Sequence, residues 1–255
     1  MLPAPRVRGR RARTVLLAFL VGAAYLAWVQ GPAPDMATAS AANLRGIGRM
    51  ERREFRPAEL EFADAVRLAP DHLPFRVNHG IALLSQLPAG GKDIAAQVRQ
   101  ARYLFDAVLK RDPRHRHARY CLGMISLSIH VNDLSDAHWH FAAVNDLDPD
   151  DPHTWLHLGT THPDGMYSAA ARACYERALG LDPCMNEARY KLWSALRGID
   201  DVRSAALLDN HEKLRKSGAY TKTRAVYSEM GKYAEVIGNA ACPTPDGGRS
   251  NRNRR

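Results

Sequence analysis

Helical stretches of mixed apolar and polar residues recur along the middle of the chain, and each ends in a short polar turn. The turns read LAPDH, RDPRH, LDPDD and LDPCM, and each contains one proline. Proline stops a helix because it lacks an amide hydrogen and restricts the residue before it. This pattern predicts a succession of helices, with a regular helix end before each proline.

The same residue types recur at fixed distances before these prolines, which are 43, 36 and 34 residues apart. An alanine stands twelve residues before each proline and an aromatic residue stands eight before it, while a glycine further upstream marks a preceding helix. The four sets are Gly46, Ala58, Phe62, Pro70; Gly80, Ala101, Phe105, Pro113; Gly123, Ala137, Phe141, Pro149; and Gly159, Ala171, Tyr175, Pro183. Such agreement predicts an internal repeat of helix pairs.

Each repeated residue type has a physical role. Glycine and alanine allow two helices to approach closely, and the aromatic residue is expected to fill the gap between one helix pair and the next. The second unit carries an insertion in LPAGGKDIAAQ and the third a smaller one near HVND, which explains their longer proline spacings. Because one helix pair cannot bury its own apolar face, the pairs are expected to stack and share a core.

The repeat resembles the tetratricopeptide repeat, whose marks are W-x2-L-G followed by alanine, an aromatic residue and proline. The fourth unit carries WLHLG at Trp155–Gly159 and departs from the pattern at Pro163, which should end its first helix early. The resemblance implies an all-α, right-handed α-solenoid over residues 40–217. It comprises four repeats and a capping helix pair in which Trp193 replaces the glycine.

The N-terminus predicts export or attachment to a membrane. Residues 1–14 form a basic flank with five arginines, and residues 15–30 form an uncharged apolar helix that suits either a signal peptide or a transmembrane anchor. Residues 31–39 are assigned to a linker. The positive-inside rule places the N-terminus in the cytoplasm and the body outside it, as a single-pass anchored or an exported protein.

The net charge of +9 does not indicate a nucleic-acid partner. Residues 1–14 contribute +5 and residues 239–255 contribute +3, so the remaining body carries only +1. A domain that binds nucleic acid is expected to present a basic face. The stretch 239–255 is instead predicted to be a disordered basic tail.

Residues 218–238 are too apolar for a free linker. The stretch MGKYAEVIG resembles the segment after the repeats in exported bacterial proteins that continue into FG-GAP and ASPIC/UnbV-type propellers. No strand-rich propeller sequence follows here, which is consistent with a shortened relative or a truncated chain. The alternative is that this segment lies back on the last helices.

The resemblance implies a concave groove, lined by the first helix of each pair, that binds another protein or a peptide segment. The groove residues predicted by position are Asn78, His117, Tyr120, Met124, His153, His157, Thr160, Tyr190 and Lys191. The leading hypothesis is therefore a non-catalytic interaction scaffold. A structural spacer between the anchor and a missing C-terminal domain is the alternative.

The sequence predicts no cofactor, no metal site and no enzymatic activity. No phosphate-binding loop, nucleophile elbow or zinc-protease motif occurs, and the four cysteines lack metal-ligand spacing. His153 and His157 stand four residues apart on one helical face, but zinc needs further ligands. A histidine-lined groove that responds to a metal or to pH is a further alternative.

Overall fold

The computed structural model describes residues 35–87, 93–221, 227 and 229–238. The apolar stretch 15–30 and the terminal tail 239–255 lie outside these residues, so the predicted signal or anchor is not tested. Among the described residues, no helix combines the length and the apolar character that crossing a membrane requires.

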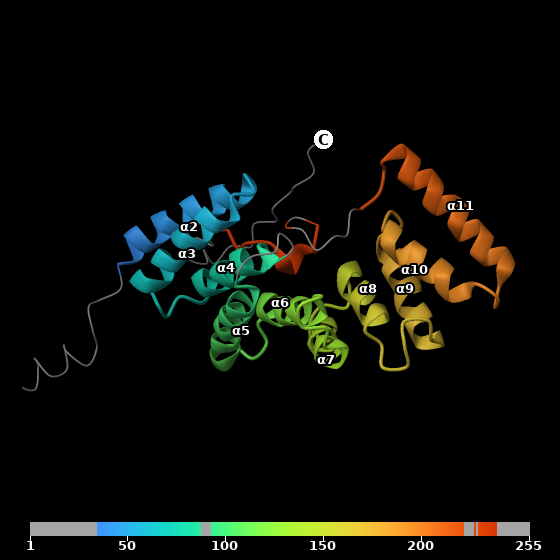
Figure 1. The fold of residues 1–255 in the computed structure, drawn as a ribbon, viewed down its shortest axis with the longest axis horizontal. Coiled ribbons are helices and arrows are strands. Elements are labelled where there is room, and N and C mark those ends of the chain that lie inside the picture. Colours follow the sequence, from blue (N-terminus) through green and yellow to red (C-terminus); the bar gives the residue numbers. More distant parts are fainter. Residues whose placement is uncertain (1–34, 88–92, 222–226, 228, 239–255) are drawn as a thin grey trace, which may run out of the picture.

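The described chain is a row of helix pairs that stack side by side, as Figure 1 shows. Each pair joins two consecutive helices, from α2 with α3 to α10 with α11. The helices are α2 (Met36–Glu51), α3 (Phe55–Leu68), α4 (Leu73–Leu84), α5 (Ile94–Arg111), α6 (Arg116–Leu127), α7 (Leu134–Asn145), α8 (Pro152–Thr160), α9 (Ala169–Leu181), α10 (Asn186–Leu196) and α11 (Asp201–Ser217). This architecture is the all-α helical-repeat solenoid that the repeat pattern predicts.

The repeated glycines and aromatic residues contact each other directly. A β-carbon on Gly80 would lie 2.5 Å from the ring of Phe105, and one on Gly159 would lie 2.5 Å from the ring of Tyr175. The ring therefore packs inside its own helix pair, which corrects the expectation that it only fills the gap between pairs. Phe141 does both, because its ring also stacks on His157 of the next pair at 4.7 Å.

Several helices begin at a side chain that caps them. The carboxylates of Asp35, Asp93, Asp133 and Asp200 each accept a hydrogen bond from the amide three residues further on. Because Asp35 caps α2, that helix begins at Met36. Residues 36–39, assigned to the linker from the sequence, therefore belong to the first helix.

One further hydrogen bond recurs at the start of the repeats. Six residues after each repeat proline, a side chain donates to that proline's carbonyl oxygen, over 2.6–2.8 Å. The donors are Arg76, Arg119, Trp155 and Arg189. This bond ties the turn after one pair to the first helix of the next.

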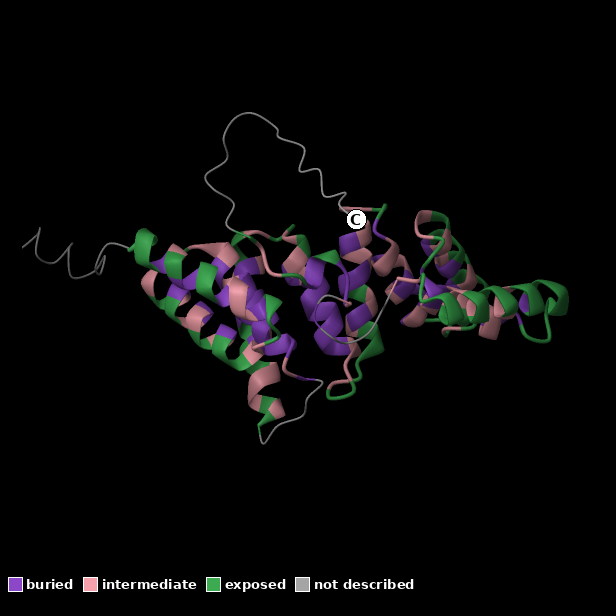
Figure 2. Cartoon of the chain, turned by 90° about the horizontal axis from the view of Figure 1, so that it is seen from above, coloured by how far each residue is buried: buried purple, intermediate pink, exposed green. Residues whose placement is uncertain are grey.

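Helices α8 and α11 have the features that the sequence predicts for the fourth repeat and for the capping pair. Helix α8 has 9 residues, against 12 in α4 and α6, because Pro163 follows it closely. Helix α11 buries only Ser204 among its residues and is exposed along most of its length, as Figure 2 shows. A water-facing last helix is what a terminal repeat requires.

The largest buried cluster lies around α4 to α7 and contains residues that are distant in the sequence. It includes Val77, Ile81, Phe105, Tyr120 and Phe141 from the helices. It also includes Tyr227, Met230, Tyr233 and Ala234, which follow the last helix. The C-terminal part of the described chain is therefore packed against the middle of the solenoid.

Candidate functional site

The first helices of the pairs carry a segment of the chain's own C-terminal part, which we call the tail segment (residues 227 and 229–238). Its short 3-10 helix η2 (Lys232–Ala234) lies against α6, and the segment passes the ends of α4 and α6 in Figure 1. It enters from Thr221, whose amide donates to the carbonyl oxygen of Cys184 at 2.9 Å. The segment therefore lies over the middle repeats. The alternative interpretation from the sequence, that it lies back on the last helices, is wrong.

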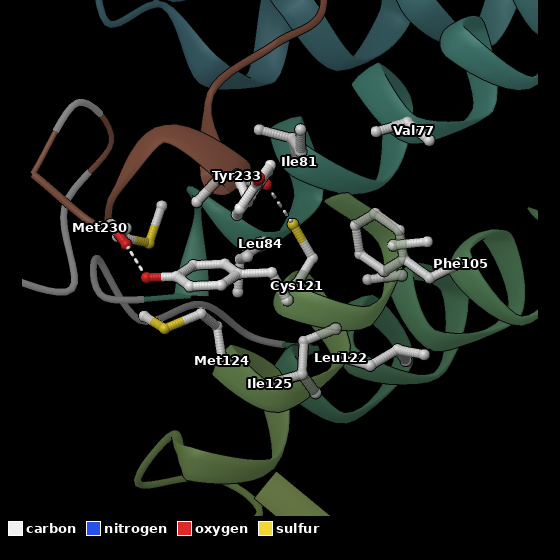
Figure 3. Close-up of a cluster of buried hydrophobic side chains, with 14 of the residues drawn as sticks. Val77, Ile81, Leu84, Phe105, Cys121, Leu122, Met124, Ile125, Met230 and Tyr233 are labelled. Carbon is white, nitrogen blue, oxygen red and sulfur yellow. Dashed lines mark hydrogen bonds between the residues drawn. The ribbon is translucent and has the colours of Figure 1, made fainter. Parts of the chain in front are cut away.

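Two side chains of α6 bind the main chain of the tail segment. The buried hydroxyl of Tyr120 donates to the carbonyl oxygen of Met230. The thiol of Cys121, also buried, lies 3.4 Å from the carbonyl oxygen of Tyr233 and donates to it, as Figure 3 shows. Both contacts are made to main-chain carbonyl oxygens, so neither depends on which side chains the segment carries.

Asn78 of α4 holds the far end of the tail segment with a pair of hydrogen bonds. Its carboxamide oxygen accepts from the amide of Ile237 at 2.7 Å, and its amide nitrogen donates to the carbonyl oxygen of the same residue at 2.9 Å. The same nitrogen also donates to Asn43 of α2 at 2.8 Å, which fixes the orientation of the carboxamide. A side chain that pairs with both main-chain groups of one residue recognises an extended peptide.

Gly231 lies where no other residue fits. Its φ of 101° belongs to the region that residues with a side chain rarely adopt. A β-carbon there would lie 2.7 Å from the hydroxyl of Tyr120 and 3.0 Å from the ring of His153. The groove therefore requires glycine at this point of the segment.

An acidic corner receives the next two residues. The Asp148 carboxylate accepts hydrogen bonds from the ammonium group of Lys232, at 2.6 Å, and from the hydroxyl of Tyr233. Asp151, which caps α8, lies 3.7 Å from the same ammonium group. Burial opposes ionisation of Asp148, but the bonds from Lys232 and Tyr233 outweigh it and hold the pKa of Asp148 below its ordinary value.

Three histidines border the tail segment, and burial keeps them neutral. The ring of His117 meets that of Tyr233 edge to face at 5.2 Å, and burial lowers the pKa of His117 to about 4. Burial also lowers the pKa of His153, and it lowers that of His157 to about 3. Within the described ranges, no three histidine, cysteine, aspartate or glutamate side chains come together as metal ligands. These histidines serve as packing partners of the groove.

Eight of the nine predicted groove residues fall into two sets in the structure. Asn78, His117 and Tyr120 lie beneath the tail segment. A cavity of about 450 Å³ beside Met230 is lined by the others, which are Met124, His153, His157, Thr160 and Lys191.

Tyr190 lies apart from both sets. Its ring contacts Trp193 at 5.0 Å and His211 of α11 at 5.4 Å, and 41% of the residue is exposed. Glu187 and Lys191, four residues apart on α10, line the cavity in its place.

Sequence reasoning missed the residues that make the contact specific. The sequence pattern predicts that Asp148 is a turn residue and that Gly231 and Lys232 are ordinary members of an apolar tail. One signal was present, because a glycine followed by a lysine is unusual inside an apolar segment that has to be buried. Nothing local shows that the segment would meet Asp148, which is 84 residues away.

Solved structures with a similar fold are themselves proteins of helical repeats. MamA from Desulfovibrio magneticus RS-1 superposes with a TM-score of 0.58 over 71% of this chain and 96% of its own, at 21% identity. PilF from Pseudomonas aeruginosa gives 0.58 over 69% of this chain and 76% of its own, at 14% identity. Both are built of tetratricopeptide repeats. The chain has the tetratricopeptide repeat fold.

Among curated proteins, NPG1 from Arabidopsis thaliana is 38% identical over 117 residues. The match covers 44% of this chain and only 16% of NPG1, so the chain spans a small part of that protein's length. No protein-family model matches the chain. These comparisons establish the tetratricopeptide repeat fold and leave the partner to be inferred from the groove.

Proposed function

We propose that this protein is a non-catalytic interaction module whose concave groove binds an extended segment of a partner protein. The observation that carries the proposal is the double hydrogen bond between Asn78 and the main chain of Ile237. It supports a groove built to hold a peptide main chain. Proteins with the tetratricopeptide repeat fold are typically scaffolds for other proteins, which agrees with this proposal.

The helix stack preorganises such a groove for binding. Contacts within the helix stack orient both Asn78 and Tyr120, because Asn78 donates to Asn43 of α2 and the Tyr120 ring packs against Phe141 and His157. A preorganised surface loses little side-chain freedom on binding. Main-chain hydrogen bonds then provide affinity, and pockets for particular side chains provide specificity.

The reactive side chains of the groove do not support a catalytic role. Burial raises the pKa of the Cys121 thiol, so it stays protonated, and a thiol rather than a thiolate is a poor nucleophile. Burial likewise raises the pKa of Tyr120 far above neutrality. Both groups donate hydrogen bonds to carbonyl oxygens instead.

The cellular setting is a separate part of the proposal. We infer from the arginine flank and the apolar stretch 15–30 that the chain is anchored in, or exported across, a membrane with its repeats outside the cytoplasm. Carbonate extraction of membranes from cells that make the full chain tests this. An anchored chain stays with the membrane pellet, whereas a chain recovered in the cytosol contradicts both forms of the proposal.

A photo-crosslinking residue at two positions of the full chain tests the interaction. His130 is exposed and lines the cavity beside the tail segment, whereas Tyr103 is 69% exposed on α5 and serves as the control. In extracts of the source cell, we expect a defined partner to crosslink from position 130 and not from position 103. Equal labelling from both positions contradicts groove binding, and no labelling from either favours the spacer.

A further inference from the structure

We infer that the tail segment is a resident ligand of the groove, and that the partner's segment has the same chemistry: a glycine, then a basic residue, then a tyrosine. The inference rests on the proposed function and specifies the partner that the groove accepts. It also implies that the partner must displace the tail segment.

The hydrogen bonds that hold the tail segment are separate from those within the helices, while its Tyr227, Met230, Tyr233 and Ala234 lie in the largest buried cluster. The side chains of Tyr120, Cys121 and Asn78 bind the segment's main chain, and the Asp148 carboxylate binds the side chains of Lys232 and Tyr233. Within the described part of the chain, no main-chain hydrogen bond joins residues 227–238 to a helix of the solenoid. The segment can therefore leave without breaking the hydrogen bonds of any helix.

Three consecutive residues of the segment define the sequence that fits. Gly231 is required by its positive φ and by the closeness of Tyr120 and His153. Lys232 extends toward two carboxylates, and Lys or Arg in a partner can do the same. Tyr233 is buried to 6% exposure with its hydroxyl on Asp148, so the position selects a ring that carries a hydrogen-bond donor.

The end of the segment imposes little further selection. Asn78 binds only main-chain atoms there, while the side chains of Val236 and Ile237 are half-buried. A partner therefore needs an extended main chain at this point and no particular side chain. Selectivity is concentrated in the glycine, the basic residue and the tyrosine.

A partner can gain contacts that the tail segment does not make. The cavity of about 450 Å³ that begins beside Met230 has mainly apolar walls. These walls include Leu84, Leu87, Met124 and Leu156, and Lys191 and Glu187 supply charge. A bulky apolar residue placed shortly before the partner's glycine would bury additional surface in this cavity, which is favourable at about 25 cal/mol per Å². That gain allows a separate molecule to compete with a tethered segment.

Covalent attachment of the tail segment determines how strongly it competes with a separate peptide. Because the tail segment belongs to the same chain, a separate molecule competes with an effective concentration on the order of a millimolar. A free peptide with the same contacts then binds the intact protein more weakly than it binds an empty groove. Its apparent Kd is the intrinsic Kd divided by the fraction of molecules whose groove is empty. We expect this weakening to be at least about tenfold.

The test uses a fluorescein-labelled peptide of residues 229–238, EMGKYAEVIG, and three full-length proteins. These are the unchanged chain, Gly231→Val, where even a β-carbon lies too close to Tyr120 and His153, and Gly238→Val, where a β-carbon meets nothing within 4 Å. By fluorescence anisotropy, we expect the peptide to bind Gly231→Val at least about tenfold more tightly than the other two. Peptides with valine for the glycine, or glutamate for the lysine, should lose this binding.

Amide hydrogen exchange of residues 229–237 checks that the substitution has released the segment. If Gly231→Val fails to fold, Lys232→Glu takes its place, because it sets a negative charge against Asp148 and Asp151 on a residue that is exposed. If both variants fold and keep the segment protected, Gly231 and Lys232 do not govern docking and the inference is overturned.

Two other outcomes also overturn it. No peptide binding to a released variant means that the groove does not recognise this chemistry in a separate molecule. Concentration-dependent dimers of the unchanged chain in sedimentation, abolished by Gly231→Val, would make the occupant a second copy. A partner that crosslinks from position 130 while the peptide fails to bind leaves the proposed function standing and removes only this inference.

Discussion

Gly46 and Gly48 are two residues apart in α2 and have opposite surroundings. A β-carbon on Gly46 would lie 2.5 Å from the ring of Phe62, whereas one on Gly48 would meet only the end of the Arg52 side chain at 3.6 Å. Glycine is unfavourable inside a helix, so only close packing explains its retention at position 46. The repeat pattern identified Gly46 and not Gly48, which shows that recurrence in sequence located a physical contact.

We predict that Gly46→Ala and Gly48→Ala change stability in opposite directions. The first overpacks the contact with Phe62 and should lower the free energy of unfolding by about 1–3 kcal/mol. The second replaces an uncrowded helical glycine and should raise it by about 0.5–1 kcal/mol. Urea unfolding of both variants measures this, and a gain in both would show that the ring does not crowd Gly46.

The buried histidines make stability depend on pH. The pKa of His117 falls from 6.5 to about 4 because burial disfavours its charged form, and His115, Arg116 and Lys232 add repulsion. Between these values the unfolded chain binds a proton that the folded chain does not. The stabilisation is therefore complete above pH 6.5 and is lost as the pH falls toward 4.

We predict that His117→Gln flattens this dependence. Each such histidine should lower the free energy of unfolding by about 1.4 kcal/mol per pH unit in that window. Urea unfolding at pH 7.5, 6 and 5 should show a smaller decline in His117→Gln than in the unchanged chain. An equal decline in both would contradict the assignment.

At the scale of elements, the helix pairs follow from local rules. Capping aspartates, repeat prolines and the early stop before Pro163 act within a few residues, so the sequence is sufficient to predict them. The start of α2 was missed because Asp35 is an effective cap in a stretch that otherwise resembles a linker. The side chains that donate to the proline carbonyl oxygens were also missed. Three are arginine and one is tryptophan, so the position does not recur as a single residue type.

We predict that this recurring bond stabilises the turn between pairs. Trp155→Phe removes the indole donor that lies 2.7 Å from the carbonyl oxygen of Pro149 and should cost about 1 kcal/mol. Trp139 is 58% exposed, and Trp139→Phe is the matched control with a smaller expected loss. Thermal unfolding of the two variants compares them, and equal losses would show that the bond does not stabilise the turn.

At the scale of the whole molecule, the tail segment contacts three successive repeats. Lys232 bonds to Asp148 before α8, Tyr233 lies on α6 and Ile237 pairs with Asn78 on α4. Stacked repeats normally contact only their neighbours. The segment therefore runs along the groove in the opposite direction to the repeats and connects them.

Sequence reasoning could not predict this placement. The repeats are specified by contacts between neighbouring helices, and their pattern is visible because it recurs. The pairing of Asn78 with Ile237 spans 159 residues and occurs once, so no periodicity reveals it. The apolar character of residues 218–238 showed only that the segment must be covered by something.

Exchange of the Ile237 amide, measured by NMR in the full chain, tests the central claim that the groove binds a peptide main chain. The structure predicts that this amide is protected in the unchanged protein. It also predicts that Asn78→Ala, which removes its acceptor, abolishes the protection while the amides within α6 remain protected. An Ile237 amide that exchanges in the unchanged protein as fast as in a free peptide would contradict the account.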